Sequence, residues 1–196
     1  MTRVALFHSV LGVRPGIEDG AERLQAAGHE VLVVDQYDGR VFDDCDEAGA
    51  HAEAIGYPEL MRRAAAAVEV LDDGFVAVGF SNGGGMAEYV ATQRRVAGVS
   101  MLSGALPLEM LGAEGWPAGV PAQIHYTADD PFRRQDWIDA VAASVRSAGA
   151  PLDVFDYPGV GHLFTDPSRP GEHQPDEAAL LWQRLLAFAP LAGGTS

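Results

Sequence analysis

Short apolar runs alternate along this chain with longer segments in which apolar residues recur at helical spacing. Continuous apolar runs rich in Val, Leu and Phe are typical of strands that are buried on both faces. Segments with apolar residues on one side and good helix formers throughout are typical of amphipathic helices. The predicted strands are Val4–His8, Val31–Val34, Phe75–Phe80, Val99–Ser103, Ala122–Tyr126 and Leu152–Phe155. The predicted helices are Ile17–Ala27, Pro58–Leu71, Gly83–Arg94, Trp137–Ala148 and Glu177–Phe188.

The order of these segments predicts an α/β fold. Because buried strands are separated by helices, the strands are expected to form one mainly parallel sheet of about six strands, with helices on both faces. The length of 196 residues fits a single domain over residues 1–196, without a large cap domain. Residues 191–196 are expected to be a frayed tail.

Two segments, Asp35–Gly56 and Leu106–Gly119, show no convincing periodicity and are expected to lack regular structure. Each follows the predicted carboxyl end of a strand, and loops at these ends line the binding crevice of open α/β sheets. We therefore expect them to supply apolar substrate contacts through Phe42, Met110 and Trp116. The alternative, that the two segments only cover the edge of the sheet, carries equal weight at this level.

A candidate nucleophile stands between the third strand and the helix that follows it. Gly79-Phe80-Ser81-Asn82-Gly83 has the spacing G-x-S-x-G of a nucleophile elbow. A serine at the apex of such a turn has a strained backbone, so the positions two residues away on each side must lack side chains. On its own the motif is also compatible with a glycine-rich turn that contains an incidental serine.

The chain also supplies an acid and a base after Ser81. A serine hydroxyl becomes a nucleophile when a histidine takes its proton and a carboxylate orients that histidine. His162 follows the last strand in the glycine-flanked segment "PGVGHLF", and Asp129 and Asp130 follow the fifth strand. Asp130 is preferred over Asp129 because Pro131 holds the preceding residue in an extended conformation. The other histidines are expected to be structural or solvated: His8, His29, His51, His125 and His173.

The predicted nucleophile also requires an oxyanion hole made of two backbone N–H groups. The N–H of Asn82 is expected to be one donor, because it follows Ser81 at the start of a helix. The loop "HSVLG" after the first strand is expected to supply the other donor from Val10, with Leu11 as the nearest rival. Ser9 and Leu11 are also expected to contact the substrate.

Composition narrows the classes of partner. The formal net charge of −15 and the absence of a basic stripe argue against binding to nucleic acid. No apolar stretch approaches the length of a membrane span, and the chain opens directly on a strand-like run. We therefore expect a cytoplasmic protein that acts on a small molecule and does not bind a membrane, while the oligomeric state is not predicted.

The single cysteine, Cys45, excludes an internal disulfide and any multi-cysteine zinc site. It lies among acidic residues, which should raise the pKa of its thiol, so we expect a structural or exposed thiol. The pairs His162 with Asp166 and His125 with Asp129 offer two ligands each, fewer than a catalytic zinc site needs. We therefore expect neither a metal nor an organic cofactor.

Taken together, these segments resemble the dienelactone hydrolase family of the α/β-hydrolase fold. The resemblance covers most of the chain: "HSVLGVRPGIEDGAERLQAAGHEVLVVDQYDG", "VGFSNGGGMA", "YTADDPF" and "YPGVGHLFTDPSRP" resemble the family's first loop, elbow, acid loop and histidine loop. The resemblance implies a Ser81–Asp130–His162 triad, in agreement with the reading of the residues alone.

Three positions depart from the family's best-known members, which use a cysteine nucleophile where this chain has Ser81. Those members carry a glutamate at the position of Ser9, and an arginine that helps to bind the substrate's carboxylate at the position of Asp166. A serine that is activated by histidine needs no such glutamate, so the first two departures are mutually consistent. The negative charge of Asp166 would repel an anionic lactone. Arg169, three residues further along the chain, could reach inward, although we do not assign it a compensating role.

The leading hypothesis is therefore a serine hydrolase that cleaves a small, uncharged ester or lactone through an acyl-enzyme intermediate. A thioesterase or small-amide hydrolase would present the same residues. A third hypothesis, from another class, is a non-catalytic α/β-hydrolase module that binds a ligand. The presence of all three triad residues argues against this module, because binding alone does not need them.

Overall fold

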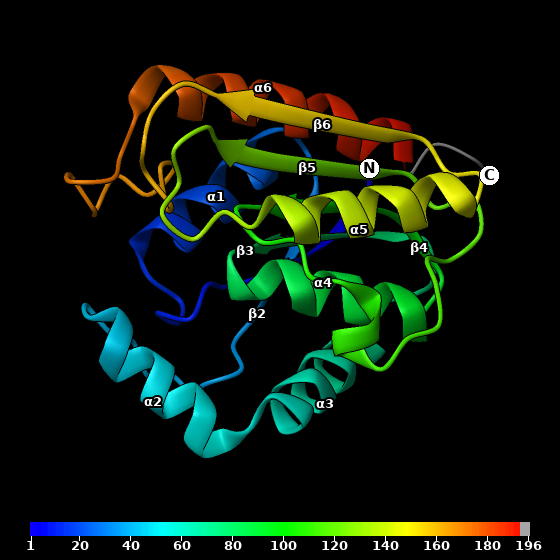
Figure 1. The fold of residues 1–196 in the computed structure, drawn as a ribbon, viewed down its shortest axis with the longest axis horizontal. Helices are drawn as coiled ribbons and strands as arrows, with labels where there is room; N and C mark the ends of the chain where they lie inside the picture. The colour runs from blue at the N-terminus through cyan, green and yellow to red at the C-terminus, as the bar shows by residue number, and fades with distance from the viewer. Residues whose placement is uncertain (193–196) are drawn as a thin grey trace.

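The structure, a computed structural model, describes residues 1–192 and contains a six-stranded sheet in the order β2-β1-β3-β4-β5-β6. All neighbouring strands in it are parallel, as the sequence predicts (Figure 1). β3 lies in the middle of the sheet, and all of its residues are buried. The strands are β1 (Arg3–Phe7), β2 (Glu30–Val34), β3 (Phe75–Phe80), β4 (Val96–Leu102), β5 (Ala122–Thr127) and β6 (Leu152–Tyr157).

Helices cover both faces of this sheet, which confirms the predicted layers. α1 and α6 pack on one face, and α3, α4 and α5 pack on the other, while α2 lies beside α3 and away from the strands (Figure 1). The α-helices are α1 (Pro15–Ala26), α2 (Cys45–Ile55), α3 (Tyr57–Ala67), α4 (Asn82–Gln93), α5 (Gln135–Ser147) and α6 (Pro175–Ala192). Two short 3₁₀ helices are η1 (Val68–Val70) and η2 (Leu108–Leu111).

The core is divided between the two faces by the alternation of side chains along each strand. Leu6, Val76 and Val78 point toward α1 and α6, are fully buried, and belong to the same cluster of core side chains as Trp182. The neighbouring Phe7 and Ala77 point to the other face, where they join side chains of α3 and α4. Burial on both sides explains why the strands read as continuous apolar runs.

The prediction that residues 35–56 lack regular structure is wrong, because α2 forms at Cys45–Ile55. The carboxylate of Asp44 accepts hydrogen bonds from the backbone N–H groups of Asp46 and Glu47, both at 2.9 Å. Asp44 followed three residues later by Glu47 is a capping signal, and the alanine-rich segment behind it favours a helix. The acidity of the segment concealed this signal.

The last helix is longer than predicted. α6 continues to Ala192, so residues 191–192 belong to it, and the rest of the expected tail, residues 193–196, lies outside the described residues. Among the helices of residues 1–192, none combines the length and the apolar character needed to cross a membrane.

Candidate active site

Ser81 stands at the tip of the turn between β3 and α4, with φ 52° and ψ −119°. A positive φ is unfavourable for a residue with a side chain, and such strain is typical of a nucleophile elbow. Glycine is required on both sides of the turn. A Cβ atom on Gly79 would overlap the carbonyl of Gly83, and one on Gly83 would overlap the carbonyls of Phe7 and His8. The elbow therefore presses directly against the carboxyl end of β1.

Two further glycines support this turn, and the sequence reasoning did not single them out. A Cβ atom on Gly84 would overlap the carbonyl of Gly104, and one on Gly104 would overlap the carbonyl of Ser81. The backbone of the loop after β4 thus lies in contact with the elbow. The signal was present as the run "NGGG" after Ser81 and as the glycine two residues beyond β4.

The structure brings Ser81, His162 and Asp130 together in one hydrogen-bonded chain. The Oγ of Ser81 lies 2.7 Å from Nε2 of His162, and Nδ1 of His162 lies 2.8 Å from Oδ2 of Asp130. A carboxylate can only accept, so Nδ1 of the imidazole donates and Nε2 is left to accept the hydroxyl proton. This is the tautomer that a histidine base requires.

The two candidate acids have opposite surroundings. Asp130 is buried, its side chain has no exposed surface, and its Oδ1 accepts a hydrogen bond from the backbone N–H of Phe132 at 2.8 Å. Asp129 is exposed, and its backbone N–H donates to the carbonyl of Gly159 at 3.0 Å. The structure therefore directs Asp130, rather than Asp129, toward His162. The hydrogen bond from Asp129 also anchors the loop that carries the histidine.

The loop after β1 presents Val10 rather than Leu11 as the available donor. The N–H of Leu11 donates to Oγ of Ser9 at 3.2 Å and is thereby occupied. Within residues 1–192, the backbone N–H groups of Val10 and Asn82 have no protein acceptor. Val10 lies in the loop that follows β1, and Asn82 is the first residue of α4, directly after Ser81.

Three of the residues expected to contact the substrate, Ser9, Leu11 and Phe42, lie in or beside the loop after β1. Leu11 is buried against Ala48 of α2 and Leu163, and Phe42 packs beside them. Ser9 is buried, and its hydroxyl fixes the turn of its own loop. Leu11 and Phe42 thus lie beside Leu163, which directly follows His162, and α2 is an unpredicted part of this wall. Contact of these side chains with a substrate stays a prediction.

Trp116 does not lie near Ser81, so the prediction that it contacts the substrate is corrected. Its indole N–H donates to the carbonyl of Val120 at 2.7 Å, and its backbone N–H donates to Oγ of Ser144 at 3.1 Å. Val120 lies two residues before β5, at the amino end of that strand, whereas Ser81 follows the carboxyl end of β3. The loop from β4 must cross the sheet to begin a parallel β5, and Trp116 lies on the far part of this path.

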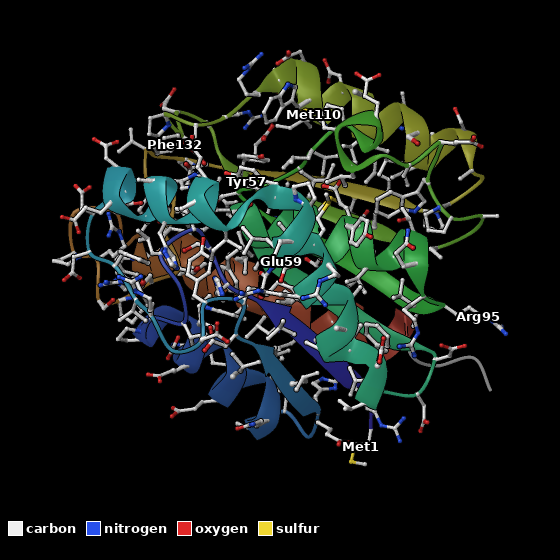
Figure 2. All side chains as sticks on the ribbon, turned by 90° about the horizontal axis from the view of Figure 1, so that it is seen from below. Met1, Tyr57, Glu59, Arg95, Met110 and Phe132 are labelled. Atoms are coloured by element: carbon white, nitrogen blue, oxygen red, sulfur yellow. The ribbon has the colours of Figure 1, made fainter. Side chains whose placement is uncertain are left out.

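Phe132 is a site residue that the sequence reasoning missed. Its ring centroid lies 4.7 Å from that of His162, although 60% of the residue's surface is exposed. Tyr57 and Met110 are also exposed on the face seen in Figure 2, where all three residues are labelled. An exposed aromatic ring directly against the imidazole forms an apolar rim beside the serine.

Asp166 is buried and already partnered. Its Oδ1 accepts hydrogen bonds from the N–H and the hydroxyl of Ser168, at 2.8 Å and 2.7 Å. Its Oδ2 lies 3.8 Å from Nε of Arg14, whose guanidinium also binds Asp43. Arg169 does not reach inward to a substrate, because its guanidinium binds the carboxylate of Glu172.

The groups considered for metal binding do not form a cluster. Within residues 1–192, no set of three or more His, Cys, Asp or Glu side chains is arranged to hold a metal ion. His125 is buried between the hydroxyl of Tyr157 and the side chain of Gln123. The thiol of Cys45 is exposed, and its pKa is raised chiefly by partial burial, with the acidic neighbours adding to the shift and Arg169 opposing it.

Comparison with known proteins identifies a family and supports the fold. The model of the dienelactone hydrolase family matches residues 2–190. A dienelactone hydrolase-like promiscuous phosphotriesterase from metagenomic libraries superposes with a TM-score of 0.83 at 24% identity, over 95% of this chain and 84% of that one. A dienelactone hydrolase from Anabaena variabilis superposes with a TM-score of 0.69 at 17% identity, over 96% and 85% of the two chains.

The sequence match to a curated relative covers a much smaller part of the chain. A Salmonella typhi protein named "Putative carboxymethylenebutenolidase" is 32% identical over 69 residues, which are 35% of this chain. The match spans only a quarter of that relative's length, 25%.

Proposed function

The chain belongs to the dienelactone hydrolase family, and we propose that it is a serine hydrolase that cleaves a small, uncharged ester or lactone. The observation that carries this proposal is the continuous chain of hydrogen bonds from Ser81 through His162 to Asp130. It lies at the carboxyl ends of parallel strands, where open α/β sheets bind their ligands.

The proposed reaction has two halves. Oγ of Ser81 attacks the carbonyl carbon while its proton passes to Nε2 of His162, and the N–H groups of Val10 and Asn82 bind the resulting oxyanion. The bond to the leaving oxygen then breaks, and that oxygen takes the proton from Nε2. Water attacks the acyl carbon in turn and gives a proton to Nε2, which returns it to Oγ as the acid leaves. Asp130 keeps the imidazole in its tautomer and stabilises its charged form.

The charges around the site favour a neutral substrate. Where the best-known family members offer an arginine to the substrate's carboxylate, this chain has Asp166. Arg14 is shared between Asp43 and Asp166 itself, which leaves a net negative charge on these three side chains, and Arg169 is bound to Glu172. A second negative charge about 4 Å from Asp166 would cost about 1 kcal/mol in a water-like environment and more in a less polar pocket.

The test is turnover that depends on Ser81. We expect the protein to hydrolyse p-nitrophenyl acetate and to react with a fluorophosphonate, and we expect Ser81→Ala to lose both activities. Ser147→Ala, at an exposed position of α5, is the matched control and should behave as the unmodified protein does. A folded protein that shows neither reaction would support the non-catalytic module instead.

Substrate class is tested with a panel of a neutral lactone, an anionic dienelactone and a thioester. We expect kcat/KM to be at least about fivefold higher for the neutral lactone than for the anionic one, from the repulsion of about 1 kcal/mol. A preference for the anionic lactone would show that the charge argument is wrong.

A further inference from the structure

His8 is fully buried at the end of β1, and both of its ring nitrogens are engaged. Nδ1 lies 2.6 Å from the carbonyl oxygen of Ser9, and Nε2 lies 3.1 Å from the backbone nitrogen of Gln36. A carbonyl oxygen only accepts and a backbone N–H only donates, so the ring carries its proton on Nδ1. Burial lowers the pKa of His8, which keeps this neutral form in place.

The hydrogen bond to Ser9 also orients the next peptide group. The peptide bonds of the described chain are trans, and in a trans peptide the C=O and N–H groups point in opposite directions. The carbonyl of Ser9 is held by Nδ1–H of His8 and by the N–H of Gly12, the latter at 3.1 Å. The N–H of Val10, on the other side of the same peptide plane, is therefore directed away from the imidazole.

We propose that His8 is a positioning residue for the oxyanion hole, aiming the N–H of Val10 at the carbonyl oxygen of the substrate. The proposal rests on the serine hydrolase function proposed above. His8 neither touches the substrate nor transfers a proton. Through its bond to Gln36 it also ties the oxyanion loop after β1 to the loop after β2, so the peptide plane has a support on a second strand.

Two substitutions separate the two hydrogen bonds of the ring. Asparagine places an amide nitrogen near the position of Nδ1, so His8→Asn keeps a donor for the carbonyl of Ser9 and loses the acceptor for Gln36. Glutamine places an amide oxygen near the position of Nε2, so His8→Gln keeps the acceptor and loses the donor. His125→Asn is the matched control, because His125 is equally buried and bonded through both nitrogens but lies outside the site.

We expect His8→Gln to lower kcat for p-nitrophenyl acetate by about 10- to 100-fold with little change in KM, since loss of an entire oxyanion donor costs about 10²–10³. KM should hold because the oxyanion forms only in the transition state. We expect His8→Asn to retain most of kcat, although it leaves a larger void and a lower thermal midpoint. The control His125→Asn should lose stability and keep kcat.

If His8 had only a structural role, the order of kcat in the two variants would be reversed. Activity would then follow thermal stability, and His8→Asn would be impaired at least as much as His8→Gln; that result overturns the proposal. If the unmodified protein shows no turnover that depends on Ser81, the proposed function is wrong and this proposal is wrong with it. If the unmodified protein is active but His8→Gln and His8→Asn have the same kcat, this proposal alone is overturned.

The tautomer provides a test that requires no stable variant. In a long-range ¹H–¹⁵N spectrum of the unmodified protein labelled with ¹⁵N-histidine, we expect the His8 ring to show a protonated Nδ1 and an unprotonated Nε2. A spectrum with the proton on Nε2 would contradict the hydrogen bond to Ser9 on which the proposal depends.

Discussion

At the scale of the residue, the site depends on which partner each nitrogen of His162 meets. The buried carboxylate of Asp130 faces Nδ1, and the hydroxyl of Ser81 faces Nε2. The proton must therefore reside on Nδ1, which leaves Nε2 free to act as a base. The ring of Phe132 lies beside the imidazole, with 4.7 Å between the two ring centroids.

This arrangement predicts a large effect of Asp130→Asn on kcat. The amide can turn its NH₂ group toward Nδ1, which moves the ring proton to Nε2 and leaves nothing to accept the serine proton. We expect kcat to fall by about 10³–10⁴ with KM nearly unchanged, in steady-state assays. Asp129→Asn, at the exposed neighbouring position, should retain full activity; a loss in Asp129→Asn alone would mean that the acid has been misassigned.

The hydrogen-bonded chain of Ser81, His162 and Asp130 could be predicted from residue types, because each of the three stands just beyond a strand. Pro131 distinguishes Asp130 from Asp129. Trp116 could not be placed in the same way. Its position depends on how far along the β4–β5 connection the chain has crossed the sheet, and apolar pattern carries no information on this. Phe132 was missed because its ring is exposed, so no burial pattern marks it.

At the scale of the element, close backbone contacts hold the elbow in place. α4 begins at Asn82, directly after Ser81, and its first turn contains Gly83 and Gly84. These glycines touch the end of β1 and the loop after β4. Each contact is to a backbone carbonyl, which cannot move aside as a flexible side chain can. The run of glycines is therefore a packing requirement as well as a conformational one.

Glycines in two helices should consequently respond in opposite ways to alanine. Gly84→Ala, in α4, places a methyl group against the carbonyl of Gly104, and we expect a loss of about 3 kcal/mol in the free energy of unfolding. Gly49→Ala, in α2, meets nothing within 4 Å, and we expect a gain of about 0.5–1 kcal/mol from helix propensity. Urea titrations followed by circular dichroism measure both values; equal effects would refute the role given to the close contacts.

The sequence pattern did not predict α2, for two reasons. Its capping signal, Asp44 with Glu47, lies inside a run of acids that is typical of a solvated loop. Only Ala48 and Ala52 are buried in it, so its apolar face consists of alanines and lacks the larger side chains that reveal a helix by periodicity. The helix is stabilised by its contacts with Leu11 and Leu163, which are distant in sequence.

At the scale of the whole molecule, the order of the strands assembles the site. β1 and β3 are neighbours, so the oxyanion loop meets the elbow, and β5 and β6 are neighbours, so Asp130 meets His162. Parallel strands place all four loops at one edge. The number of strands, their direction and the residues that meet at their ends were predictable. The wall formed by α2 and the charge pairing of Asp166 depend on contacts between remote segments.

Buried histidines make the stability of the molecule depend on pH. Burial lowers the pKa of His125 from 6.5 to about 3, so below pH 6.5 the unfolded chain binds a proton that the folded chain excludes. Stability must then fall as the pH falls. Between pH 7.5 and pH 5 we expect this group to remove about 2 kcal/mol from the free energy of unfolding.

Urea titrations of the unmodified protein and of His125→Asn at the two pH values isolate this contribution. The variant is less stable at pH 7.5, but its loss on acidification should be smaller by about 2 kcal/mol. Parallel losses in the two proteins would show that His125 titrates normally in the folded state.

The central claim, that the hydroxyl of Ser81 becomes a nucleophile through His162, is tested most directly by trapping the acyl-enzyme. Acid quench of the protein during turnover of p-nitrophenyl acetate, followed by intact-mass spectrometry and peptide mapping, should reveal one acetyl group on Ser81. The His162→Ala variant should accumulate none on the same timescale. Acetylation at another residue, or turnover without any covalent species after rapid quench, would contradict the mechanism.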